Sequence, residues 1–140
     1  MSAPIFDHEK LKAYQEALRF LGWITPILDR LPHKVAAKDQ LDRASTSIAL
    51  NLAEGNGKRS HPDRCRYFDI ARGSGVECAA CLDVLRVKKL LTDEEVTAGK
   101  VILVEVVSMT AGLIARFGGN LREDPAEYPV NEGIEEKEKD

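Results

Sequence analysis

Apolar residues recur at helical spacing along most of the chain, and the first such stretch lies near the N-terminus. Its apolar residues are separated by three, four or seven positions: Leu11, Tyr14, Leu18, Leu21 and Leu28. This spacing places side chains on one face of an α-helix and predicts a helix over about residues 7–31. Pro26 lies inside it and lacks a backbone N–H, so we expect a bend near residues 22–26 rather than an end.

The second apolar stretch predicts a helix over about residues 38–54. Its apolar stripe consists of Leu41, Ala44, Ile48 and Leu52. Gly55 follows directly, and glycine is favoured just after a helix because it tolerates a left-handed backbone.

Two further helices begin at recognisable capping sequences. In "SHPD", Ser60 is the expected N-cap, followed by a proline in the first turn, and this helix should continue to about Leu90. In "TDEE", Thr92 and Glu95 have the spacing of a capping box, and the apolar period continues to Phe117. The segment "VILVEVV" has the β-propensity of a strand, but the cap before it and the period after it favour a helix.

Four helices with short connections and no hairpin signals predict an all-α fold, an antiparallel up-and-down four-helix bundle over residues 1–118. Residues 119–140 differ in composition. They contain eight acidic and three basic residues, a charge of −5, which leaves +2 for the rest of a chain whose total is −3. Because this acidic segment has few apolar residues, we expect it to be a flexible, disordered tail.

The predicted fourth helix is apolar over most of its circumference. Its polar strip is narrow: Glu105, Ser108, Gly112 and Arg116. One core buries only one stripe of a helix, so the excess predicts contact with a second subunit and therefore a homo-oligomer. The alternative is that the acidic tail folds over this face.

Length and composition are those of one soluble domain of 140 residues. We expect no membrane-spanning segment and see no export signal at the N-terminus, which favours the cytoplasm. The odd number of cysteines, Cys65, Cys78 and Cys81, suits a reducing compartment. Cys78 and Cys81 form a C-x-x-C, but no second ligand pair accompanies it, so we interpret both as small packing residues.

A polar stripe runs beside the apolar one on the predicted second helix. It is spaced at three, four, four and three residues: Gln40, Arg43, Ser47, Asn51 and Glu54. Short serine and asparagine side chains are poor helix formers on a solvated face but suit close helix contacts. We therefore expect a hydrogen-bonded network with Arg72, Ser74 and Glu77 of the third helix. The alternative is a solvated face with incidental spacing.

Signatures of catalysis, metal binding or cofactor binding are not found. His8, His33 and His61 are too far apart for paired ligands on one helix, and neither a P-loop nor a G-x-S-x-G motif is present. Glu54 and Glu77 could act as an acid/base pair, but structural pairing with Arg43 or Arg72 is the favoured interpretation. We expect no catalytic residues, no metal and no cofactor.

A basic cluster surrounds the predicted connection between the second and third helices. It consists of Lys58, Arg59, His61, Arg64 and Arg66. A smaller group, Arg86, Lys88 and Lys89, lies at the other end of the third helix. Such residues are commonly just solvated surface. Repeated around an oligomer, however, they would form a positive belt for phosphates, so the cluster is a candidate nucleic-acid site. Aromatic residues do not alternate with the basic ones, which favours backbone contact over base readout.

The stretches "DQLDRASTSIALNLAEGNGKRS" and "RYFDIARGSGVE" resemble the four-helix-bundle proteins encoded in intervening sequences of 23S rRNA genes. This family is related to the accessory variability determinant of diversity-generating retroelements. The matching positions are Gln40, Arg43, Ala44, Ser47, Ile48, Asn51, Ala53, Glu54 and Gly55, then Ser60, Phe68, Ile70, Ala71, Gly73, Ser74 and Glu77. The resemblance implies a closed homopentamer without catalytic activity and, in the retroelement branch, an electropositive surface that engages nucleic acid and a reverse transcriptase.

Two hypotheses of function follow from these observations. In the first, the protein is an oligomeric accessory factor that binds RNA or DNA. In the second, it is a protein-interaction scaffold with no nucleic-acid role. The basic cluster and the resemblance favour the first hypothesis, and the acidic overall charge favours the second. An enzyme is the least favoured class.

Overall fold

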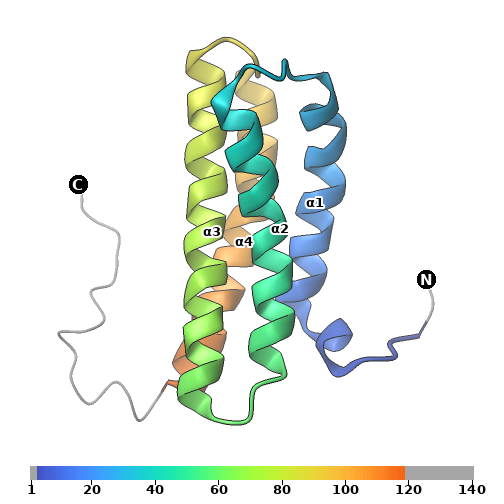
Figure 1. The fold of residues 1–140 in the computed structure, drawn as a ribbon, viewed down its shortest axis with the longest axis vertical. Helices are drawn as coiled ribbons and strands as arrows, with labels where there is room; N and C mark the ends of the chain where they lie inside the picture. Colours follow the sequence, from blue (N-terminus) through green and yellow to red (C-terminus); the bar gives the residue numbers. More distant parts are fainter. Residues whose placement is uncertain (1–2, 119–140) are drawn as a thin grey trace, which may run out of the picture.

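The computed structural model describes residues 3–118 and folds them into an antiparallel four-helix bundle (Figure 1). Its elements are a short 3-10 helix η1 (Asp7–Lys10) and the helices α1 (Lys12–Arg30), α2 (Ala36–Asn56), α3 (His61–Val87) and α4 (Asp93–Phe117). The predicted all-α, up-and-down architecture is confirmed for these residues. The acidic tail predicted over residues 119–140 lies outside the described residues.

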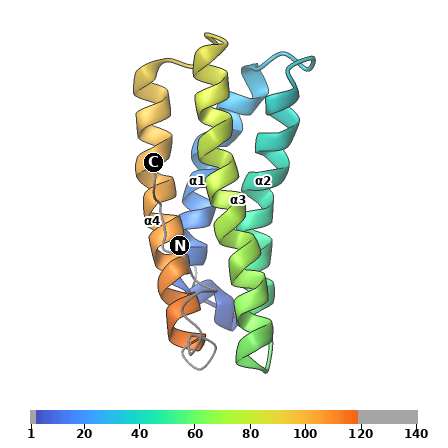
Figure 2. The same ribbon diagram turned by 90° about the vertical axis from the view of Figure 1, so that its left-hand side faces the viewer.

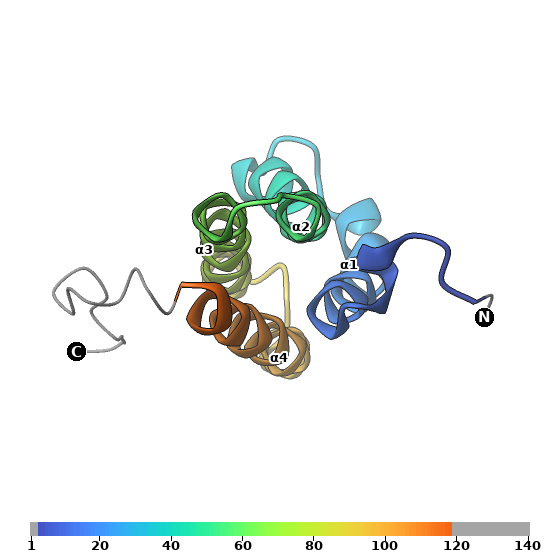
Figure 3. The same cartoon turned by 90° about the horizontal axis from the view of Figure 1, so that it is seen from below.

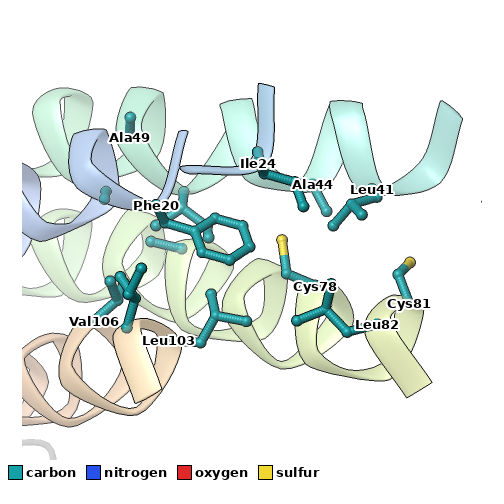
Figure 4. Close-up of a cluster of buried hydrophobic side chains, with 14 of the residues drawn as sticks. Phe20, Ile24, Leu41, Ala44, Ala49, Cys78, Cys81, Leu82, Leu103 and Val106 are labelled. Carbon is teal, nitrogen blue, oxygen red and sulfur yellow. The ribbon is translucent and has the colours of Figure 1, made fainter. Parts of the chain in front are cut away.

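Each helix packs against its neighbour in the chain, and α4 returns to pack against α1 (Figure 3). The core fills the space that the four helices enclose. In Figure 4, side chains from all four helices converge there, among them Phe20 of α1, Leu41 of α2, Cys78 and Leu82 of α3, and Leu103 and Val106 of α4. All six side chains are buried, so a single core holds the bundle together.

The buried stripe of α1 differs from the predicted one. It consists of Ala13, Ala17, Phe20, Ile24, Ile27 and Leu28, whereas Leu18 is 45% exposed. Two small alanines at the start of α1 and Phe20 in its middle face the core. The spacing of apolar residues alone does not show that this side of the helix, rather than the side of Leu18, is the buried one. Pro26 lies within α1, which continues to Arg30. The first residues of the predicted helix instead form η1, where the Glu9 carboxylate accepts the backbone N–H of Phe6 at 2.9 Å.

Helix α2 begins two residues before its predicted start and ends two residues after its predicted end. Its N-cap, Val35, makes no side-chain capping bond. Lys38, inside the first turn, donates from Nζ to the Leu31 carbonyl at 2.9 Å and ties the preceding connection to the helix. Gly55 does not end the helix but lies within it, where a Cβ atom would approach the Phe68 ring to 2.9 Å. The glycine therefore allows α3 to pack closely rather than allowing α2 to stop.

Both predicted capping sequences form as expected. Ser60 Oγ accepts the backbone N–H of Asp63 at 3.2 Å. Thr92 and Glu95 form a reciprocal capping box at 3.1 and 2.9 Å. The predicted end of α3 is three residues too late, because Lys89 adopts a left-handed conformation with φ of 64°. The Leu90 N–H then bonds the Leu85 carbonyl at 2.9 Å, which closes the helix as a Schellman motif without a glycine.

Helix α4 is unusually apolar for a helix with so much exposed surface. Over an 18-residue window its mean hydropathy is 1.7, and 33% of that window is buried. By length and composition alone α4 is long and apolar enough to cross a membrane, a test that a core helix of a soluble protein also passes. Its inner side packs in the core through Ile102, Leu103 and Val106. The excess lies on its outer side, where Val101 and Val104 are 57% and 60% exposed.

Candidate nucleic-acid interface

The candidate basic residues gather at one end of the bundle. The antiparallel order brings η1, the connection between α2 and α3, and the last turn of α4 together there, at the lower end in Figure 1. Lys58 and Arg59 lie in the connection, and His61, Arg64 and Arg66 lie in the first two turns of α3. All five candidates of the predicted cluster therefore share one end.

Two of the five candidates are engaged with acidic residues three or four positions before them in the chain. Lys58 Nζ lies 3.2 Å from the Glu54 carboxylate and 5.0 Å from the centre of the Tyr67 ring. The hydrogen bond to Glu54 raises the pKa of Lys58, so it keeps its charge. Arg66 is 2.7 Å from Asp63. These exposed pairs contribute little stability, but they reduce the charge available to a phosphate.

The other three candidates are not paired with carboxylates in the part of the chain that the structure describes. Arg59 is exposed and makes no ion pair within residues 3–118. The Arg64 guanidinium lies over the Phe117 ring, 4.9 Å from its centre, and the His61 ring lies 5.0 Å from the same ring. A residue that we did not predict joins them, because Arg116 of α4 also lies over Phe117, at 5.1 Å. Its distance in sequence from the rest of the cluster concealed it.

The smaller basic group lies at the opposite end of the bundle. Arg86 lies in the last turn of α3 and is 3.5 Å from Asp83 and 4.0 Å from Asp93, while Lys88 and Lys89 lie in the turn before α4. The two basic groups are therefore separated by the length of α3, and each end must be considered as a separate surface.

The polar stripe of α2 meets α3 at one point. The Ser47 and Ser74 hydroxyls are hydrogen-bonded at 2.9 Å. Asn51 donates from Nδ2 to the Ser47 carbonyl at 2.9 Å and to Ser47 Oγ at 3.0 Å. Ser74 is buried and the other two are half-buried. Short polar side chains thus form a hydrogen-bonded contact where the two helices approach closely.

The remaining members of the predicted network do not join this contact. Gln40, Arg43, Arg72 and Glu77 are exposed, and none makes a hydrogen bond or ion pair within the described residues. Glu54 pairs with Lys58 instead of reaching α3. The expected pairing of Glu54 or Glu77 with Arg43 or Arg72 is therefore wrong. The long side chains extend into solvent, and only the short ones bridge the two backbones.

An apolar groove runs between α3 and α4 on the outside of the bundle, along the side seen in Figure 2. It has a volume of about 380 Å³ and is lined mainly by Gly75, Val76, Ala79, Leu103, Val104 and Val107. Val76 and Val104 are 53% and 60% exposed. At its margin, Lys100 is neutralised by Asp83 at 2.7 Å. The groove therefore offers contact area and little unpaired charge.

The cysteines are buried on the inner side of α3. Burial raises the pKa of Cys78 to about 12 and also raises the pKa of Cys81, which keeps both thiols protonated and unreactive. Within residues 3–118, no three His, Cys, Asp or Glu side chains are grouped closely enough to hold a metal ion.

The fold and these surfaces define a helical-bundle protein with an exposed apolar groove and a basic end. The chain belongs to the 23S rRNA-intervening sequence protein family, whose model matches residues 9–112. The resemblance inferred from the two sequence stretches is therefore confirmed. No curated protein sequence matches the chain.

A solved structure supports the same architecture. It is the crystal structure, at 1.70 Å resolution, of a protein with unknown function from the S23 ribosomal protein family of Bacteroides thetaiotaomicron VPI-5482. The two chains are 21% identical and superpose with a TM-score of 0.69, over 73% of this chain and 97% of the other. At this identity the similarity shows the shared fold and nothing about activity.

Proposed function

We propose that this protein is a non-enzymatic bundle that self-associates through the α3/α4 groove and binds nucleic-acid phosphates at its basic end. The observation that carries the proposal is the apolar outer side of α4, where Val101 and Val104 are more than half exposed within the described bundle. Self-association supports the proposed phosphate binding, because the modest positive charge of one basic end is repeated on every copy of the assembly.

The spacing on the outer side of α4 supports helix-to-helix association. Exposed residues follow one another at intervals of four, three, four, three and four: Thr97, Val101, Val104, Ser108, Ala111 and Ala115. Intervals that alternate between four and three residues are the spacing of a coiled-coil seam, and small or β-branched side chains allow a partner helix to approach closely. A helix of a second copy is the occupant that we propose, in a homopentamer as the family resemblance implies.

The charge at the end of the bundle supports contact with phosphates. Within residues 3–118, seven basic residues lie there: Lys10, Lys12, Lys58, Arg59, Arg64, Arg66 and Arg116. Four acidic residues of the same range accompany them, Asp7, Glu9, Glu54 and Asp63, so the described part of this end carries +3. A charge of this size on one copy binds a polyanion weakly, whereas several copies acting together bind it more strongly.

The proposal is tested by measuring the mass of the full chain and its binding to structured RNA over a range of salt concentrations. Light scattering should give a multiple of the 15.5 kDa chain mass. The slope of log affinity against log salt should flatten in the double variant Lys58→Glu, Arg59→Glu. It should change less in Lys34→Glu, Lys88→Glu, which makes the same charge change at the other end. A monomer, or equal slopes for both variants, contradicts the proposal.

A scaffold without a nucleic-acid role is the second candidate. The ion pairs of Lys58 and Arg66 favour it, because they neutralise two of the predicted phosphate contacts. In that case the assembly would bind a protein partner, such as the reverse transcriptase implied by the resemblance. An oligomer that fails to bind RNA at about 50 mM salt, where phosphate contacts are strongest, would support this candidate.

A further inference from the structure

Three nitrogen-rich side chains surround one aromatic ring at the basic end of the bundle. Arg64 and Arg116 each lie about 5 Å from the centre of the Phe117 ring, at 4.9 and 5.1 Å, so their guanidinium carbons are at most about 10 Å apart. His61 packs against the same ring at a steep angle, with ring centres 5.0 Å apart. Residues from the start of α3 and the end of α4 thus form one cluster.

Within residues 3–118, the two arginines of this cluster have no carboxylate partner. No carboxylate lies within ion-pair distance of Arg64 or Arg116 in the described residues. The nearest acidic residue in sequence, Asp63, is already paired with Arg66 at 2.7 Å. Moreover, Arg64 Nε is the one buried side-chain nitrogen or oxygen within residues 3–118 that has no hydrogen-bond partner. A buried donor without a partner is costly, and such groups call for a specific explanation.

The contacts with Phe117 place the two arginines where they could bind an oxyanion. A guanidinium held over a ring by a cation–π contact can still form paired hydrogen bonds through N–H groups that the ring does not cover. The ring also limits the rotation of both side chains, so less entropy is lost when a ligand binds. The positive end of α3, which begins at His61, adds to the attraction for an anion.

We propose that Arg64, Arg116 and His61, arranged around Phe117, form a binding site for a phosphate group. The arginines bind the phosphate oxygens, His61 donates a further hydrogen bond, and Phe117 holds both arginines in place. This inference rests on the proposed function, because the phosphate would belong to a nucleic-acid backbone. It also changes which residues we expect to contact phosphate. Arg116 is added, whereas Lys58 and Arg66, which are paired with carboxylates, are not part of this site.

The competing role for these arginines is structural. The carbonyl end of α4 is partially negative, and a positive side chain nearby stabilises it. A purely structural role predicts lower thermal stability in arginine variants without any effect on anion binding. The test must therefore measure binding and stability separately.

The experiment measures binding of inorganic pyrophosphate to the full chain by calorimetry at about 50 mM salt. Arg64→Gln and Arg116→Gln should each weaken binding about tenfold, which equals about 1.4 kcal/mol, since each removes a charge-assisted contact. Arg66→Gln is the control, because it removes the same charge from the same end but at a residue paired with Asp63. It should change the affinity less than threefold. Thermal melts of each variant report any structural role.

Two results overturn the site. The first is an equal effect of Arg66→Gln and Arg116→Gln, which would show attraction by net charge alone. The second is the lack of saturable pyrophosphate binding at millimolar concentration. Parallel RNA titrations separate this inference from the proposed function. If RNA binds and Arg116→Gln leaves its affinity unchanged, the site is wrong while the function stands. If pyrophosphate binds at the site but RNA does not bind, the function is wrong while the phosphate site stands.

Discussion

Helices α1 and α4 lie side by side, bury similar stripes in one core, and differ in what they expose. The outer side of α1 is mainly polar, with Lys12, Gln15 and Arg19 exposed and Arg19 paired with Glu16 at 2.9 Å. At the exposed positions on the outer side of α4 there are instead valines, alanines and a glycine. The core therefore accounts for the apolar residues of α1 apart from Leu18, but it leaves the exposed valines of α4 unexplained.

This difference indicates which surface of the bundle lacks a packing partner. An amphipathic helix such as α1 buries its apolar side in the core and exposes its polar side to water. Contiguous apolar surface beyond that is a mark of an interface, because its exposure to water is unfavourable. The groove between α3 and α4 lies directly beside the apolar side of α4, so the two features form one surface.

The largest expected effect comes from placing a charge on that surface. Val104→Glu should convert the oligomer to monomers, because a buried carboxylate without a partner is costly at an interface. Leu18→Glu is the control on α1, at a position that is 45% exposed. It should leave the mass unchanged. Light scattering measures the mass, and circular dichroism checks that both variants stay helical. Equal masses for the two variants would contradict the conclusion that α4, and not α1, forms the interface.

A smaller effect should separate the inner and outer sides of α4. Gly99 faces the core, where an added Cβ would lie 2.7 Å from both Leu82 and Trp23. Gly112 faces outward, with nothing within 4 Å of such an atom. Gly99→Ala should lower the free energy of unfolding by about 1–3 kcal/mol through overpacking. Gly112→Ala should raise it in the monomer by about 0.5–1 kcal/mol through better helix propensity.

Both glycine variants are measured by urea unfolding in the Val104→Glu background, which removes the contribution of assembly. A stabilising Gly99→Ala would show that Trp23 moves aside without cost. A destabilising Gly112→Ala in the monomer would contradict the assignment of that position to the exposed side.

The sequence was sufficient to predict the elements that depend on nearby residues. The caps at Ser60 and Thr92 were predicted correctly because each bond joins residues three positions apart. The α2 stripe of Leu41, Ala44, Ile48 and Leu52 was also predicted correctly, since the helical period alone defines it. The apolar excess of α4 was visible for the same reason.

Features that depend on distant residues could not be predicted in this way. Gly55 matches the pattern of a helix end, but its role is set by Phe68 of the neighbouring helix. Arg116 stands alone in the sequence and joins the basic end only because α4 runs antiparallel to α3. Lys89 closes α3 in a conformation that usually requires glycine or asparagine, so no local signal marked that end.

The smallest expected effect concerns the inner and outer residues of the polar stripe on α2. Asn51→Leu removes two hydrogen bonds to Ser47, at 2.9 and 3.0 Å, in a half-buried contact. Ser47 Oγ keeps its bond to Ser74, so the loss should be about 1 kcal/mol in the free energy of unfolding.

Gln40→Leu is the control on the same stripe, because Gln40 is exposed and makes no hydrogen bond within residues 3–118. It should change stability by less than about 0.5 kcal/mol. Urea unfolding of both variants in the Val104→Glu background decides the matter: equal values would mean that the whole stripe is solvated, whereas a difference locates its structural role at the Ser47–Ser74 contact.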